Sequence, residues 1–329
     1  MGNSLLLLAS ANGLGHARRL FHLHHEFLRQ SIESELIVNS YQFNKCKSEF
    51  PKTTLDKVFI SNSKFGLDGP HAIFRDREEL DVTSIRICNA ENIVSDNLIW
   101  PASYNPNVFV HGHFTWVDYW NKLLDSTIIS PPAELGFEIS LKKEVRAWFA
   151  TESFRFPQSF LNDAYVPMPL IAYPNDRDYK LYKRNWKEIW VSIGTTNDEI
   201  FLNFDLVLES LERLGFEIRR HETYLFHDLQ VLPGLVIGRP GLGTIRDCLA
   251  SGTAFLTPID GTHNKLSDPE LSNNLEVLSV LGLLPSLESI NVRELQQFSE
   301  IYRAFWVANS SPISDYSNRI LQVISEMRR

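Results

Sequence analysis

The chain has 329 residues, 43% hydrophobic and 22% charged, a composition typical of a soluble globular protein with room for two domains. Its formal net charge of −8 argues against broad nucleic-acid binding, because no cationic excess is present to neutralise phosphates. The three cysteines lie far apart and show neither metal-ligand nor disulfide spacing, which favours reduced thiols in the cytoplasm.

The first apolar run, Leu5–Ala9, is too short to span a membrane, and no basic segment precedes it. We therefore expect a buried strand here rather than a signal peptide, and a cytoplasmic protein. Peripheral contact with the inner face of a membrane stays open.

The first half of the chain alternates apolar runs with amphipathic segments. Strands are predicted over residues 5–10, 35–39, 108–110 and 148–150. A helix is predicted over residues 17–29, since its apolar residues recur with helical spacing. Continuous apolar runs bounded by loops are typical of strands buried on both faces of a parallel sheet.

A proline-rich stretch between Val166 and Asn185 interrupts this pattern and predicts a linker. Beyond it the alternation resumes, with strands predicted over residues 189–193, 216–219, 235–237 and 254–257 and helices over 204–214 and 313–329.

These patterns predict an α/β protein with two Rossmann-like domains that face each other across a cleft. We expect an N-terminal domain over residues 1–166, a linker over 167–185, a C-terminal domain over 186–310, and a closing helix over 311–329 that packs back on the N-terminal domain. In such sheets, ligands bind beyond the carboxyl ends of the strands. The segments that follow strands are therefore the candidate sites.

The loop after the first strand, ANGLGHARR over residues 11–19, contains a candidate general base. Gly13 and Gly15 allow a sharp turn and a close approach to a ligand. His16 follows at a helix N-terminus, where the helix dipole favours the neutral imidazole that a base requires. Arg18 and Arg19 can meet an anion. An ordinary strand–helix turn with a solvent-facing histidine is the alternative, because so short a motif is weak.

Two later loops offer donors for a phosphate. In IWVSIGTT, Gly194, Thr195 and Thr196 present backbone N–H groups and hydroxyls, although a capped helix start explains the same residues. In LVIGRPGLGTIRDCLASG, residues 235–252, a strand is followed by a glycine-rich turn and a helix predicted to start at Thr244. That order favours phosphate binding.

Side chains beyond this turn are suited to sugars. Asp247 can accept hydrogen bonds from a ribose diol, although Thr244 and Asp247 also have the spacing of a helix capping box. Glu270 and Asn273 share one face of a predicted helix and can hydrogen-bond sugar hydroxyls.

These motifs, in this order, resemble the donor-binding domain of GT-B glycosyltransferases, especially the MurG-like and UDP-glycosyltransferase group. RPGLGT over 239–244, Asp247, ASGTAFLTP over 250–258 and Glu270-x-x-Asn273 occupy the places of the family's HGG-x-G-T, acidic residue, A-x-G-x-P and Gln-x-x-Asn patterns. VSIGTT resembles its phosphate loop, and GLGHARR resembles the G-x-G-H loop of MurG-like proteins and nucleotide-sugar hydrolases. The resemblance covers residues 185–285 and 4–30.

The chain departs from the family pattern at three places. Arg239 replaces a histidine, Asp247 replaces a glutamate, and Glu270 replaces a glutamine. Glutamate only accepts hydrogen bonds, so Glu270 requires hydroxyls or an amine on the sugar. Donor specificity is expected to differ at these positions.

The resemblance implies a GT-B fold and an inverting, metal-independent transfer of a sugar from a nucleotide-diphosphate donor to a hydroxyl acceptor. We expect a UDP-sugar as donor, no cofactor, no nucleic-acid partner, and an acceptor from bacterial glycan, glycolipid or glycoconjugate synthesis. Asp247 would bind ribose, and Glu270 and Asn273 would bind the donor sugar. The remaining donor and phosphate contacts would be Gly13, Gly15, Gly194, Thr195, Thr196, Arg239, Gly241, Gly243 and Thr244.

The segment VHGHFTWVDYW, residues 110–120, follows a predicted strand. The resemblance implies an acid about a hundred residues after the first-loop histidine that orients it as a base, and Asp118 is the candidate. His111, His113 and Trp116 are candidate acceptor contacts, with core packing as the alternative for the aromatic side chains. No third ligand accompanies the two histidines, so we expect no metal site.

Two other functions stay open. A nucleotide-sugar hydrolase of the nonulosonic acid pathway type would share the histidine loop and donor site, with water as the acceptor. A catalytically silent GT-B binding subunit is compatible with the substitutions at Arg239, Asp247 and Glu270.

Overall fold

The structure is a computed structural model, and it describes residues 4–11, 13–61, 81–126, 130–131, 133–174, 176, 183–192, 205–221, 231–257, 268–286 and 289–327. The chain divides into two compact units. The first comprises residues 1–169 and 312–329, and the second comprises residues 170–311.

The first unit is built on a parallel sheet. Among the described residues it has seven strands in the order β3-β2-β1-β4-β5-β6-β7. The strands are β1 (Leu5–Leu8), β2 (Ser34–Asn39), β3 (Val58–Ser61), β4 (Asn92–Asp96), β5 (Val108–His111), β6 (Val145–Thr151) and β7 (Tyr165–Met168). The helices are α1 (Leu14–Arg29), α2 (Ser40–Cys46), α3 (Lys52–Leu55), α5 (Asp81–Asn89), α6 (Trp116–Ser126), α7 (Ala133–Ser140) and α12 (Ile313–Met327). Single turns of 3-10 helix lie at Lys47–Glu49, Trp100–Ser103, Lys142–Glu144 and Asn162–Ala164.

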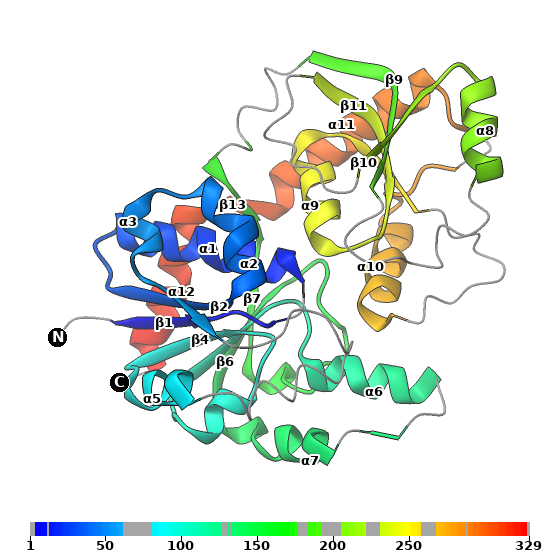
Figure 1. Cartoon of the computed structure of the whole chain (residues 1–329). Helices are drawn as coiled ribbons and strands as arrows, with labels where there is room; N and C mark the ends of the chain where they lie inside the picture. The colour runs from blue at the N-terminus through cyan, green and yellow to red at the C-terminus, as the bar shows by residue number, and fades with distance from the viewer. Residues whose placement is uncertain are drawn as a thin grey trace. The chain divides into compact units, whose positions relative to one another are not determined.

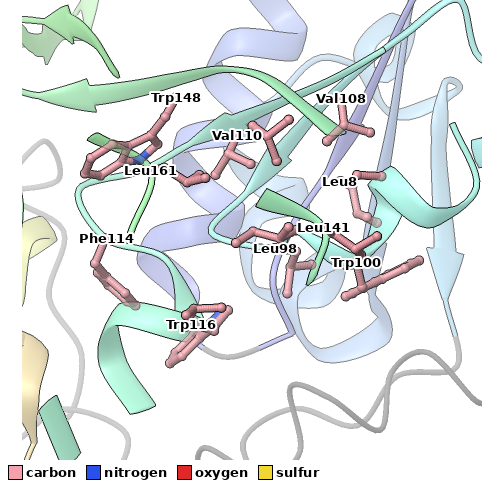
Figure 2. Close-up of a cluster of buried hydrophobic side chains, with 14 of the residues drawn as sticks. Leu8, Leu98, Trp100, Val108, Val110, Phe114, Trp116, Leu141, Trp148 and Leu161 are labelled. Atoms are coloured by element: carbon pink, nitrogen blue, oxygen red, sulfur yellow. The ribbon is translucent and has the colours of Figure 1, made fainter. Parts of the chain in front are cut away.

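Helices cover both faces of this sheet, which explains its continuous apolar strands. Leu6 and Leu8 of β1 share a core cluster with Ile87 of α5 and Leu135 of α7. Figure 2 shows part of this cluster, and Figure 1 shows α1 on the opposite side of the sheet from α5 and α7. The C-terminal helix α12 packs against α1, where Gln30 donates a 2.8 Å hydrogen bond to Ser317.

The second unit has a smaller parallel sheet with the order β10-β9-β11-β12 among its described strands, and β13 pairs with β8. The strands are β8 (Leu170–Ala172), β9 (Lys183–Ser192), β10 (Glu217–His221), β11 (Val231–Gly238), β12 (Ala254–Leu256) and β13 (Ser310–Pro312). The helices are α8 (Asp205–Arg213), α9 (Leu242–Ser251), α10 (Pro269–Val280) and α11 (Val292–Asn309). Leu208 of α8 and Leu295 of α11 pack on Ile189 and Ile237 of the sheet.

The predicted α/β class with parallel sheets is confirmed, but two predicted helix starts are wrong. The helix predicted from Ala17 begins at Leu14, and the helix predicted from Thr244 begins at Leu242. In both cases a glycine, Gly13 or Gly241, precedes the first helical residue. Glycine-rich segments that were counted as loops therefore form first helical turns.

Strand β9 also begins earlier than predicted, at Lys183, inside the segment interpreted as a linker. Within the described ranges, no helix has the length and apolar character needed to cross a membrane.

Candidate active site

The candidate base lies where the strand order of the first sheet reverses. Strands β2 and β3 lie on one side of β1 and strand β4 on the other, so the helix after β1 begins beside the end of β4. His16 is the third residue of α1, and Asp96 is the last residue of β4. Nδ1 of His16 lies 2.6 Å from Oδ2 of Asp96. Such a reversal point is the usual ligand site of an open α/β sheet.

Asp96 is the centre of a polar cluster. It is fully buried, Arg19 donates to its Oδ1 over 2.5 Å, and Nδ1 of His111 lies 3.4 Å from the same oxygen. Burial by itself raises the pKa of Asp96, but the charge of Arg19 and the hydrogen bonds from His111 and His16 outweigh it. They hold the pKa of Asp96 well below its usual range, so it is a carboxylate at neutral pH.

This carboxylate determines the tautomer of His16. Because a carboxylate only accepts hydrogen bonds, Nδ1 of His16 carries the proton and Nε2 keeps a lone pair. His16 is 9% exposed. A neutral imidazole oriented by a buried carboxylate is the arrangement of a general base.

Asp118 does not orient His16, and the predicted pairing of these two residues is wrong. Both oxygens of Asp118 accept hydrogen bonds from other residues, on either side of it in sequence. Oδ2 accepts from the N–H and hydroxyl of Thr115, both at 2.8 Å, and from Ser159 at 2.7 Å, while Oδ1 accepts from the N–H of Phe160 at 2.7 Å. Asp118 lies in the first turn of α6, where its carboxylate stabilises the helix start.

Sequence reasoning missed Asp96. The segment NIVSD, residues 92–96, has only two strongly apolar residues, Ile93 and Val94, so it was not assigned as a strand. Its signal was an acidic residue two positions after a short β-branched run, Ile93 and Val94.

The three candidate acceptor contacts are buried, which corrects their predicted role. His111, at the end of β5, is 1% exposed, and its Nε2 lies 2.8 Å from the hydroxyl of Tyr316. His113 is also buried. Trp116 lies in the core shown in Figure 2, and its Nε1 donates to Ser10 over 3.2 Å. All three are therefore interior side chains of the first unit and not exposed acceptor contacts.

Gly112 and Asn97 pack closely against each other directly after the strand ends that carry Asp96 and His111. Gly112 has a φ of 130°, and a Cβ atom there would lie 1.7 Å from the side-chain amide of Asn97. In the orientation that satisfies its amide, Asn97 donates to the carbonyl oxygens of Phe114 and His111 over 2.7 and 3.2 Å. Only glycine fits position 112.

In the second unit, the glycine-rich turn joins β11 to α9. Gly241 precedes the helix, and among the residues that the structure describes no side chain caps its first turn, which leaves the first-turn N–H groups free to meet an anion. The turn touches the start of α10, since Asn274 donates to the carbonyl of Pro240 over 2.9 Å. Arg239 lies 3.6 Å from Asp268, the residue that caps α10. The structure therefore places Arg239, Gly241, Gly243 and Thr244 beside the helix that carries Glu270 and Asn273.

Asp247 belongs to an ionic cluster behind this turn. Arg246 is buried, pairs with Asp176 and Asp247, and donates to the carbonyl of Ile171 over 3.0 Å. The alternative interpretation of Thr244 and Asp247 as a capping box is wrong, because the residue before the helix is Gly241 and Thr244 already lies inside the helix.

Several solved structures share the fold of this chain. No family model and no curated protein sequence matches this chain. Among solved structures, the spinosyn forosaminyltransferase SpnP matches 99% of this chain and 100% of its own at a TM-score of 0.62 and 11% identity. Acinetobacter baumannii MurG matches 99% of this chain and 100% of its own, at a TM-score of 0.52 and 10% identity. Phytolacca americana UGT2, solved with UDP-2-fluoro-glucose and pterostilbene, matches 100% of both chains at 0.59 and 10% identity.

This chain has the GT-B fold. The His16–Asp96 pair lies in the first unit, and the glycine-rich turn lies in the second. The predicted phosphate residues Gly194, Thr195 and Thr196 lie outside the described residues. Across the described part of the chain, no group of three or more histidine, cysteine, aspartate or glutamate side chains is arranged to hold a metal ion.

Proposed function

We propose that this protein is an inverting glycosyltransferase that moves a sugar from a nucleotide-diphosphate donor, a UDP-sugar, to a hydroxyl acceptor without a metal ion. One observation carries the proposal: a chain with the GT-B fold holds a histidine on a buried carboxylate at the ligand-binding end of its first sheet. The sequence motifs of the second unit support the same class of donor.

The proposed chemistry starts at Nε2 of His16. This nitrogen accepts the proton of the acceptor hydroxyl while the hydroxyl oxygen attacks the anomeric carbon. The bond from that carbon to the phosphate oxygen breaks, and the nucleoside diphosphate leaves with the bonding electrons. The carboxylate of Asp96 stabilises the imidazolium that forms. Attack opposite the leaving group inverts the anomeric configuration, and base catalysis of this kind contributes roughly 10²- to 10⁴-fold.

We propose that the second unit holds the donor. The first-turn N–H groups of α9, with Arg239 beside them, meet the negative charge that develops on the departing diphosphate. Gly194, Thr195 and Thr196 add phosphate donors. Asp247 binds the ribose.

Glu270 and Asn273 bind the transferred sugar in this proposal. Both lie in the first half of α10, next to the glycine-rich turn. A glutamate at the sugar position favours donors that present hydroxyl or amine hydrogens.

The test begins with thermal unfolding of the full chain against a panel of nucleoside diphosphates and sugar nucleotides, because a ligand that binds the folded state raises its stability. The preferred donor is then incubated with hydroxyl acceptors, and the anomeric configuration of the product is assigned by NMR. Turnover that persists in excess chelator supports metal independence.

His16→Ala is expected to lower kcat by roughly 10²- to 10⁴-fold with donor affinity unchanged. His22→Ala is the matched control, because His22 lies on the same helix with its ring against Phe50, away from Asp96. Full activity in His16→Ala overturns the base assignment. Release of free sugar at an equal rate without any acceptor assigns the protein as a nucleotide-sugar hydrolase, and tight donor binding with no turnover assigns a binding subunit.

A further inference from the structure

A second histidine supports the candidate base, and the proposed function does not use it. His111 lies at the end of β5, on the far side of Asp96 from His16. Its two ring nitrogens have different partners: Nδ1 lies 3.4 Å from Oδ1 of Asp96, and Nε2 lies 2.8 Å from the hydroxyl of Tyr316. Tyr316 belongs to α12, the C-terminal helix of the same compact unit.

The partners determine the direction of every hydrogen bond in this chain of groups. Asp96 is a carboxylate, so Nδ1 of His111 must donate to it. Nε2 of His111 then carries a lone pair and no proton, so the hydroxyl of Tyr316 must donate to it. The reverse tautomer would place two acceptors against each other in a site from which water is excluded, which is unfavourable.

The charged groups around His111 favour its neutral form. The pKa of His111 is lowered to about 4, with burial as the largest cause; the hydrogen bond to Asp96 opposes burial, and the positive charge of Arg19 adds to it. Among the described residues, Arg19 from α1, Asp96 from β4 and Tyr316 from α12 are the titratable groups bonded within this network, and the amide of Asn97 also contacts His16. Toward His16, the rings of Phe114 and Trp116 complete the surroundings.

We propose that His111 and Tyr316 are positioning residues for the candidate base: Tyr316 fixes His111 in its Nδ1–H form, and His111 holds the second oxygen of Asp96, which leaves the first for His16. The C-terminal helix is therefore part of the catalytic support and not only a closing element. The role in catalysis rests on the proposed function, whereas the network itself does not.

The first test uses Tyr316→Phe in the full chain with ¹⁵N-labelled histidine. Long-range ¹H–¹⁵N spectra report the tautomer and titration of each imidazole without any substrate. Without the Tyr316 hydroxyl, Nε2 of His111 loses its hydrogen-bond donor, which is expected to raise the pKa of His111 by about one unit and to shift the nitrogen signals of His16. Tyr302→Phe is the matched control, since Tyr302 is also a buried tyrosine with a bonded hydroxyl, in the second unit.

The second test separates positioning from packing at His111. His111→Asn keeps a donor near the position of Nδ1, and His111→Leu removes it. In His111→Leu the carboxylate of Asp96 loses one donor and binds the imidazolium of His16 more strongly. The acidic limb of the kcat/KM profile is therefore expected to move to higher pH in His111→Leu and to stay in place in His111→Asn, and the ring-nitrogen signals of His16 are expected to change only in His111→Leu.

With the preferred donor, Tyr316→Phe is expected to lower kcat by roughly three- to tenfold with KM unchanged, as for loss of one hydrogen bond. Unchanged His16 and His111 spectra in folded Tyr316→Phe, or equal behaviour of the two His111 variants, overturns the inference. Shifted spectra in a chain that turns over no sugar nucleotide keep the network and reject the proposed function. If Tyr316→Phe does not fold, the two His111 variants decide the outcome.

Discussion

Asp96→Asn is the substitution that most sharply tests the candidate base. The change is isosteric and removes one charge from a fully buried position. An amide has one oxygen for three donors: Arg19 at 2.5 Å and His111 at 3.4 Å share one side of Asp96, and His16 lies at 2.6 Å on the other. Arg19 only donates, so the amide oxygen turns toward Arg19 and the amide nitrogen toward His16. Nδ1 of His16 must then accept, which moves the imidazole proton to Nε2 and blocks the base.

Both the tautomer and the charge contribute to the expected loss. A histidine base held in the wrong tautomer loses about 10³- to 10⁴-fold in kcat, equivalent to about 4–5.5 kcal/mol of transition-state stabilisation. Stability falls as well, because Arg19, with 15% of its side chain exposed, loses its counter-charge. We expect the free energy of unfolding to fall by about 2–4 kcal/mol, somewhat less than when a fully buried ion pair is broken.

The assay compares kcat and the urea unfolding free energy of Asp96→Asn with those of Asp118→Asn. Asp118 is also a buried carboxylate, and it accepts four hydrogen bonds from Thr115, Ser159 and Phe160. Asp118→Asn is expected to lose about 1–3 kcal/mol of stability and to keep kcat within a few-fold.

A double variant tests the reason for the loss. In Arg19→Met/Asp96→Asn the guanidinium no longer competes for the amide oxygen, and only the longer contact to His111, at 3.4 Å, still does, so the amide oxygen can turn back toward His16. We expect kcat about tenfold above that of Asp96→Asn alone. Near-normal kcat in a folded Asp96→Asn, or a larger loss in Asp118→Asn than in Asp96→Asn, would refute the reasoning.

Three further measurements test other parts of the structure. Gly112→Ala is expected to destabilise the chain by about 3 kcal/mol or more in urea unfolding, because its Cβ has no space at a φ of 130°, whereas Gly136→Ala, with no atom within 4 Å, changes stability by about 1 kcal/mol at most. His24 and His111 have a pKa of about 4 when folded against about 6.5 when unfolded, so the unfolded chain binds protons first as pH falls. The free energy of unfolding therefore falls between about pH 6.5 and 4, by about 2 kcal/mol per pH unit near pH 5. His24→Gln is expected to halve that slope. A urea unfolding midpoint that does not change with pH across this window contradicts the assignment. Arg239→Ala is expected to weaken nucleoside diphosphate binding about tenfold in calorimetry and to reduce its salt dependence, and an unchanged Kd would argue against its phosphate role.

Local pattern was sufficient for most elements of the sheets. Strands β1, β2 and β11 are apolar runs, and each was predicted within a few residues. Glycine-rich stretches misled the helix starts, because glycine has a low intrinsic helix propensity. Gly15 and Gly243 nevertheless lie in first helical turns, since the residues after them form amphipathic helices that pack on the sheets.

Burial could not be assigned from residue type. The segment around Trp116 contains aromatic and histidine side chains that suit a ligand surface equally well as a core. The structure buries His111 because β5 lies between β4 and β6 in the sheet, and it buries Trp116 of α6 in the core cluster of the first unit; His113, between them, is buried as well.

The sequence by itself determined the α/β class, the glycine-rich turns after strands, and a histidine at the start of the first helix. The tertiary structure decided which carboxylate meets that histidine. Asp96 lies 80 residues from His16 in sequence and reaches it only because β4 pairs with β1. The same non-local packing brings Tyr316 to His111 across 205 residues. Strand order and the docking of α12 depend on long-range burial of apolar surface, which local sequence patterns do not encode.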